Sequence, residues 1–233
     1  MLAIHDREKR VIFSKGKTGT TTLQNALEGI NGWDKVMGEG DTTWYGIGAE
    51  EFGRKARQEE IVAMLSALDY DLLFVIRKPW ARYVSGWKEM LQDYISALIP
   101  EDEFTEFWDK LITDPEQLIK YIDRLFYLTQ FVCSEEQAVE HNWGRGFTLH
   151  TNYHTCNWLY MCNQFPNATI IKTENLTSFM RRIGIGPRVR SNVSKQSDID
   201  ALETALKECN HYYLIEKFLY PEQRKYDNIC QRL

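Results

Sequence analysis

Segments with two different hydrophobic patterns follow one another along this chain. Segments that predict strands lie near 11–14, 33–37, 72–76 and 168–172. Segments with apolar residues at helical spacing lie near 20–28, 56–68, 80–98 and 198–219. Strands that alternate with helices are typical of a parallel sheet. The fold class that we expect is therefore α/β, with three layers: a central parallel sheet flanked by helices.

The segment at about 101–150 interrupts this alternation. Apolar residues from Phe104 to Leu111 fit one helix, and those from Leu118 to Leu128 fit another. We interpret the segment as a helical excursion from the sheet. A chain of 233 residues suits one α/β domain, and no linker or repeat is evident. We therefore expect a single domain over 1–233.

A loop rich in glycine, lysine and threonine joins the first predicted strand to the first predicted helix. Its residues are Lys15, Gly16, Lys17, Thr18, Gly19, Thr20, Thr21 and Thr22. Loop glycines let backbone N–H groups turn toward a phosphate, a helix N-terminus adds partial positive charge, and Lys17 adds a full one. A Walker A motif needs a glycine at position 11, where this chain has Val11. The pattern indicates an anion site other than that of a nucleotide triphosphatase.

The loop resembles the 5′-phosphosulfate-binding loop of the sulfotransferases, Pro-Lys-x-Gly-Thr-Thr/Ser between a strand and a helix. Here the motif runs from Gly16 to Thr21, with glycine in place of the proline. The resemblance implies a P-loop NTPase-like sulfotransferase fold and 3′-phosphoadenosine-5′-phosphosulfate as the cofactor held by the loop. A Gly/Thr-rich turn also occurs as a structural helix cap, so a second motif has to support this interpretation.

The second motif follows the buried strand predicted at 72–76. Pro79 ends that strand, which places Arg77 at its carboxyl end, where open α/β sheets bind ligands. Sulfotransferases carry an Arg at this strand end and a Ser eight residues later, both of which bind the 3′-phosphate of the cofactor. Arg77 and Ser85 have this spacing. The alternatives are an ion pair at the sheet edge for Arg77 and an ordinary helix residue for Ser85.

Weaker resemblances, to carbohydrate sulfotransferases, extend over the rest of the chain. They are the Asn-x-His segment at 152–154, the strand that ends in Glu-Asn-Leu at 174–176, and a basic loop at 188–195. In that family the basic loop closes over the cofactor, which adds Arg190 and Lys195 to the expected binding residues. The resemblance favours a sugar hydroxyl as the acceptor, although tyrosine, a lipid or a small hydroxylated metabolite stay open.

Sulfuryl transfer needs a base for the acceptor and a cation for the leaving phosphate. The resemblance assigns the cation to Lys17, which would reach the oxygen that bridges phosphorus and sulfur. Several relatives use a Glu just after the second strand, the place that Glu39 occupies. Glu39 is the first candidate for the base, His154 the second and Asp41 the third, and a solvated turn carboxylate remains an alternative for Glu39. The scheme requires no metal.

Charge and composition limit the partners. The net charge of −5 gives no global basic field that would attract nucleic acid. No apolar run has the length of a membrane span, the first ten residues are too charged for a signal peptide, and the five cysteines form no disulfide framework. We expect a cytoplasmic protein without a membrane span, whose oligomeric state is open.

The group His150, His154, Cys156 and Cys162 matches no zinc spacing, so we expect no metal site.

Three classes of function fit these observations. The first is a sulfotransferase that uses 3′-phosphoadenosine-5′-phosphosulfate and releases 3′-phosphoadenosine-5′-phosphate. The second is a P-loop-type nucleotide kinase with a degenerate motif, which the lack of an acid for magnesium after the strand at 72–76 disfavours. The third is a non-catalytic homologue that keeps the nucleotide pocket.

Overall fold

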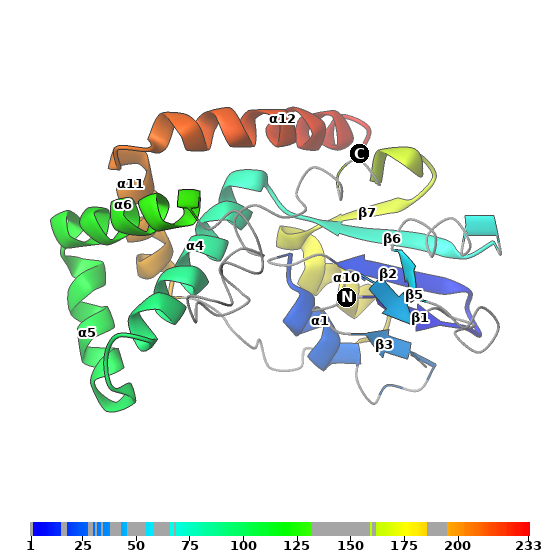
Figure 1. The fold of residues 1–233 in the computed structure, drawn as a ribbon. Coiled ribbons are helices and arrows are strands. Elements are labelled where there is room, and N and C mark those ends of the chain that lie inside the picture. The colour runs from blue at the N-terminus through cyan, green and yellow to red at the C-terminus, as the bar shows by residue number, and fades with distance from the viewer. Residues whose placement is uncertain are drawn as a thin grey trace. The chain divides into compact units, whose positions relative to one another are not determined.

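A five-stranded sheet combines four strands from the first 76 residues with a fifth at Thr169–Lys172 (Figure 1). A computed structural model describes residues 2–14, 18–27, 30, 32–33, 35–37, 43–45, 55–57, 66–67, 69–131, 159, 162–185 and 195–233. The chain divides into two compact units. The first comprises Met1–Arg77, Asn157–Val193 and Ile229–Leu233, and the second Lys78–Cys156 and Ser194–Asn228. Each unit is described by itself.

The sheet of the first unit has the strand order β3-β1-β2-β6-β7. Its strands are β1 (Leu2–His5), β2 (Arg10–Ser14), β3 (Lys35–Met37), β6 (Asp71–Ile76) and β7 (Thr169–Lys172). β2 and β6 are parallel, as are β6 and β7, whereas β1 is antiparallel to both β2 and β3. Four strands therefore run in one direction and β1 in the other, so the α/β class and the four predicted strands are confirmed.

The antiparallel strand β1 corrects the expectation of a purely parallel sheet. The turn Asp6–Lys9 joins β1 directly to β2, and the Lys9 N–H donates to the Asp6 carbonyl at 3.2 Å. Lys9 adopts a φ of +47° in this turn. A connection this short can only join antiparallel neighbours, because parallel strands need a long crossover. A further two-stranded sheet pairs β4 (Thr43–Tyr45) with β5 (Lys55–Arg57).

Both faces of the main sheet are covered, as the continuous apolar run of β6 predicts. Leu72 to Ile76 are all buried. On one face, Ile12, Leu73 and Val75 pack with residues of α1 (Thr20–Leu27) and α10 (Leu176–Arg182). On the other, the rings of Phe13 and Phe74 stack with centroids 5.2 Å apart. The sheet is thus a rigid base for the loops at its edges.

Helices make up the described part of the second unit (Figure 1). They are α4 (Pro79–Ser96), α5 (Glu101–Thr113), α6 (Pro115–Phe131), α11 (Gln196–Glu208) and most of α12 (Tyr212–Cys230). Their core includes Trp87, Met90, Ile122, Leu125 and Leu206. The two helices expected in the excursion at 101–150 are confirmed as α5 and α6, and residues 132–150 lie outside the described part.

Two predicted helices need correction. The helix expected at 56–68 is wrong at its start, because Ala56 and Arg57 pair with β4 as part of β5; most of the remainder lies outside the described residues. The helix expected at 198–219 is two helices, separated at Cys209, whose φ of −68° and ψ of 155° are extended. Asn210 then donates its backbone N–H and its side-chain amide to the Asp123 carboxylate, at 3.1 and 2.6 Å. These bonds hold the chain in a turn.

None of the helices in the described part of the chain has the length and apolar character needed to cross a membrane.

Candidate functional site

The candidate site lies at the carboxyl edge of the sheet in the first unit. β2 ends at Ser14, which is opposite Val75 of β6, and Ile76 of β6 is opposite Lys172 of β7. Because these three strands are parallel, the segments that follow them meet at one edge. Open α/β sheets bind ligands at this edge. The residues that follow are the loop before α1, then Arg77, then the 3₁₀ turn η1 (Thr173–Asn175).

The end of the loop is fixed by a buried threonine and a glycine. Thr18 is only 1% exposed, and its Oγ1 hydrogen-bonds the Ser14 Oγ at 2.9 Å. Gly19 has a φ of +88°, a conformation that L side chains rarely adopt. Its carbonyl accepts the Leu23 N–H at 3.0 Å, which starts the hydrogen bonds of α1. The strand–loop–helix arrangement predicted from the sequence is therefore confirmed over the described residues.

Gly19 is also required by a close contact with α10. A Cβ on Gly19 would lie 2.8 Å from the Leu176 Cδ2. The hydroxyl of Thr173 donates to the Ile76 carbonyl at 2.9 Å and is 3.5 Å from the Thr18 carbonyl. Thr173 thus links the ends of β6 and β7 to the loop. Sequence reasoning missed this role, because only the register of β6 against β7 brings Thr173 to the loop.

Arg77 follows β6 directly, as predicted. It is partly buried, and burial lowers the pKa of its guanidinium, while the nearby charge of Glu174 opposes that shift. Arginine starts from so high a pKa that Arg77 remains charged at neutral pH. The site therefore contains a permanent cation beside the carboxylate of Glu174, at the same edge as the loop. A guanidinium in this place suits paired hydrogen bonds to phosphate oxygens.

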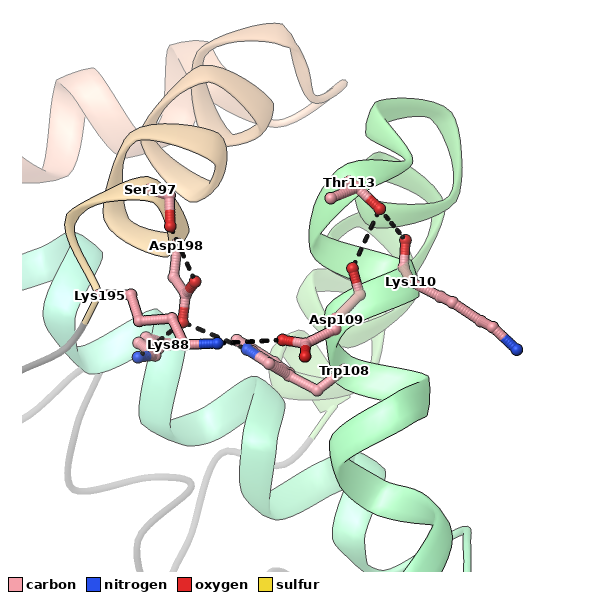
Figure 2. Close-up of polar contacts among 8 residues, drawn as sticks. All are labelled: Lys88, Trp108, Asp109, Lys110, Thr113, Lys195, Ser197 and Asp198. Carbon is pink, nitrogen blue, oxygen red and sulfur yellow. Dashed lines mark hydrogen bonds and ion pairs between the residues drawn. The ribbon is translucent and has the colours of Figure 1, made fainter.

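The other residues expected to bind the cofactor, in α1 and later in the chain, are distributed over both units. Thr20 is the first residue of α1, Thr21 is exposed and Thr22 is partly buried. Ser85 is partly buried on α4, in the second unit. Lys195 is exposed just before α11, and its Nζ lies 3.4 Å from the Asp109 Oδ1 (Figure 2). The structure therefore gives Lys195 a carboxylate contact within the second unit.

Several predicted residues lie outside the described part of the chain. They are Lys15, Gly16, Lys17, Glu39, Asp41, His154, Arg188 and Arg190. Their roles stay predictions. Of the four residues weighed as metal ligands, Cys162 is described; it is buried, and burial raises the pKa of its thiol to about 12. In the ranges that the structure describes, no group of three His, Cys, Asp or Glu side chains is placed to hold a metal ion.

Comparisons of the chain with protein-family models, with curated proteins and with solved structures gave no match.

Proposed function

We propose that this protein is a sulfotransferase that moves a sulfuryl group from 3′-phosphoadenosine-5′-phosphosulfate to an acceptor hydroxyl of a carbohydrate. One observation carries the proposal: the strand–loop–helix turn with Gly19 at positive φ lies at the same sheet edge as Arg77. The donor has two separate anionic groups, the 5′-phosphosulfate and the 3′-phosphate. A loop with backbone N–H groups and a guanidinium on the neighbouring strand suit these two groups.

The proposed reaction is an in-line displacement at sulfur. The acceptor oxygen forms a bond to sulfur while the bond from sulfur to the bridging oxygen breaks, which releases 3′-phosphoadenosine-5′-phosphate. The acceptor proton passes to a general base, for which Glu39 is the first candidate, ahead of His154 and Asp41. Lys17 stabilises the negative charge that develops on the bridging oxygen. Fixed cations supply the charge stabilisation that magnesium provides in phosphoryl transfer, so the scheme includes no metal.

Nucleotide binding tests this proposal without knowledge of the acceptor. Isothermal titration with 3′-phosphoadenosine-5′-phosphate and with ATP, each with and without magnesium, compares the three classes of function. We expect metal-independent binding of 3′-phosphoadenosine-5′-phosphate that is lost when the 3′-phosphate is absent. A magnesium-dependent preference for ATP would instead indicate a kinase. Binding of the donor without turnover on any acceptor would indicate a non-catalytic homologue.

Arg77 offers the sharpest test of the nucleotide site. Arg77→Ala removes the guanidinium proposed for the 3′-phosphate, and we expect the affinity for 3′-phosphoadenosine-5′-phosphate to fall by roughly 10- to 100-fold, the scale of a charge-assisted hydrogen bond. Arg181→Ala is the matched control, because Arg181 is an exposed arginine of α10 in the same unit. Equal affinities in the two variants would place the 3′-phosphate elsewhere.

Transfer rates test the roles of the proposed cation and the proposed base. Lys17→Ala should abolish transfer, because the leaving phosphate loses its stabilising charge. Glu39→Gln should keep the nucleotide affinity while the rate falls by about 10²- to 10⁴-fold, the typical contribution of a general base. Rates are measured with a radiolabelled donor against a panel of sugars. A wild-type rate in Glu39→Gln would pass the role of base to His154.

A further inference from the structure

Two large exposed rings lie on one line along α12 in the second unit. Tyr213 and Tyr220 are 65% and 63% exposed. They are seven residues apart, nearly two turns of helix, so both side chains point to the same side of α12. The buried residues Ile215, Leu219 and Tyr226 lie on other sides of the helix. The two exposed rings, which we call the tyrosine stripe, therefore offer contact area to a partner.

Charged side chains of opposite sign lie on the two sides of the tyrosine stripe. At ~100° of turn per residue, Lys217 and Arg224 lie roughly 30–50° to one side of it. Glu216 and Asp227 lie about as far to the other side, and all four residues are exposed. The Arg224 guanidinium is 5.9 Å from the centroid of the Tyr220 ring, which keeps this cation close to the stripe. This face of α12 thus has a basic edge and an acidic edge.

A groove on the acidic edge suits a cationic side chain. It lies between Trp80 of α4 and α12, has a volume of about 590 Å³, and is lined by Tyr212 and Glu216 among others. The Trp80 and Tyr212 rings meet edge to face with centroids 6.3 Å apart, and the Tyr212 hydroxyl donates to Glu216 at 2.8 Å. Lys207, whose Nζ is 5.7 Å from the Trp80 centroid, pairs with Glu203 at 2.7 Å, so these two charges cancel. Aromatic rings beside a carboxylate attract lysine and arginine.

We propose that a second copy of this chain binds this face, with the two α12 helices side by side and parallel around a twofold axis. An axis along the helices places the basic edge of each copy against the acidic edge of the other. Lys217 then meets Glu216 of the partner subunit. Arg224 meets Asp227 of the partner subunit, and the two tyrosine stripes pack on each other. An antiparallel pair would place like edges together, so the charges select the parallel arrangement.

The symmetry of this interface sets the strength that we expect. Both copies use the same surface, so every contact is made twice. One pair of helices buries less surface than a standard protein–protein interface, and we therefore expect a dimer with a roughly micromolar Kd. The proposal rests on α12 and its groove alone, and does not depend on the proposed sulfotransferase activity.

Charge reversal at two adjacent residues tests the proposal on the full chain. Sedimentation equilibrium should show that the wild type is in a monomer–dimer equilibrium. Glu216→Lys and Lys217→Glu, each alone, should weaken self-association about tenfold or more, because each creates two like-charge pairs across the twofold axis. A 1:1 mixture of the two variants should dimerise again, because the lysines of one variant then face the glutamates of the other. This rescue also excludes misfolding as the cause of the loss.

Glu116→Lys and Lys120→Glu are the matched controls, because both residues are exposed on α6 in the same unit. These variants should associate as the wild type does. Three results would overturn the proposal. The first is a wild type that stays monomeric at about 1 mM, far above a micromolar Kd. The second is a Glu216→Lys or Lys217→Glu variant that associates as tightly as the wild type. The third is a mixture of these two variants that associates no better than each variant alone.

Discussion

Gly19 shows how one residue determines the geometry of the proposed nucleotide loop. Its positive φ disfavours any side chain, and a Cβ there would lie only 2.8 Å from the Leu176 Cδ2. In the proposed nucleotide loop, a glycine here would let the backbone approach the anion. The structure adds a second reason, which is that α10 packs against the same position.

The variant Gly19→Ala should therefore be costly. We expect it to lower the free energy of unfolding by about 1–3 kcal/mol through backbone strain, with a further loss from the contact with Leu176. Gly184→Ala is the control for strain alone, since Gly184 has a φ of +78° and no atom within 4 Å of its would-be Cβ. Urea unfolding measures both. Equal losses would mean that α10 shifts and that the Leu176 contact contributes nothing.

Glu222 is a buried carboxylate in α12. Its side chain is inaccessible, and neither oxygen has a hydrogen-bond partner among the described residues. Burial raises its pKa to about 7, against the opposing charges of Arg82 and Lys225. The folded state therefore holds this proton more tightly than the unfolded state, whose glutamates have an ordinary pKa near 4.5.

The pH dependence of stability follows from this shift. The stabilisation is complete below the unfolded pKa and is lost as the pH rises to about 7, at a cost of roughly 3 kcal/mol for a shift of this size. In Glu222→Gln this dependence should disappear, because the amide does not ionise. Urea unfolding between pH 5 and 8 measures it, with the exposed Glu116→Gln as the control. An unchanged pH profile in Glu222→Gln would assign the carboxylate an ordinary pKa.

At the scale of elements, a buried polar cluster joins three helices of the second unit (Figure 2). The Lys88 Nζ of α4 lies 3.0 Å from the Asp198 Oδ2 of α11, and the Trp108 Nε1 of α5 donates to the same oxygen at 3.3 Å. Burial acts to raise the pKa of Asp198, but the hydrogen bonds from Lys88 and Trp108 outweigh it and hold this pKa below its usual range. The cluster fixes how these helices pack.

Removing only the lysine of this cluster should cost more stability per charge than replacing both charged residues with apolar ones. Lys88→Met leaves the Asp198 carboxylate buried without its ion pair, with the neutral donors Trp108 and Ser197 as its hydrogen-bond partners, and we expect a loss of about 3–5 kcal/mol. The double variant Lys88→Met/Asp198→Leu should lose less than the sum of the single variants, because neither charge remains. A double-mutant cycle by urea unfolding measures the coupling. Additive losses would show that the two charges do not interact.

Local patterns predicted the strands and helices that are confirmed. The apolar run before Arg77 and the helical spacing of apolar residues in α4 to α6 are patterns among neighbouring residues. The sequence alone therefore shows them. The antiparallel strand β1 was not predicted, because a purely parallel sheet contains no hairpin at the N-terminus. The break at Cys209 was also missed, since Asp123, which holds the turn, is distant in the sequence. Long-range hydrogen bonds leave no periodic signal.

For the whole molecule, the chain passes between the two units four times. The described residues of the proposed nucleotide loop and Arg77 belong to the first unit, while Ser85 and Lys195, which are also expected to bind the nucleotide, belong to the second. Neither unit is a continuous segment of the sequence. The single domain expected over 1–233 therefore stays a prediction, for a chain whose two units are interleaved. Ligand effects on the units can therefore be followed separately within one chain.

Hydrogen exchange should reveal this separation. At a concentration of 100 times its Kd, 3′-phosphoadenosine-5′-phosphate should stabilise the folded structure around its binding site by about 2.7 kcal/mol, because it binds only the folded form. We expect added protection in β2, β6 and β7, and little in α5 and α6. Exchange measured by mass spectrometry, with and without the nucleotide, compares the two units. An equal gain in α5 and α6 would show that the two units unfold together.

The sequence by itself determined the α/β class, the strand–loop–helix turn before α1 and the position of Arg77 after a buried strand. These features depend on residues that are close together in the chain, so their pattern is visible without the fold. Only the tertiary structure decided that Thr173 joins the loop, that Lys195 contacts Asp109, and that Trp80 and α12 share a groove. Each of these depends on the register of strands or the packing of helices that are far apart in sequence, and no local pattern encodes them.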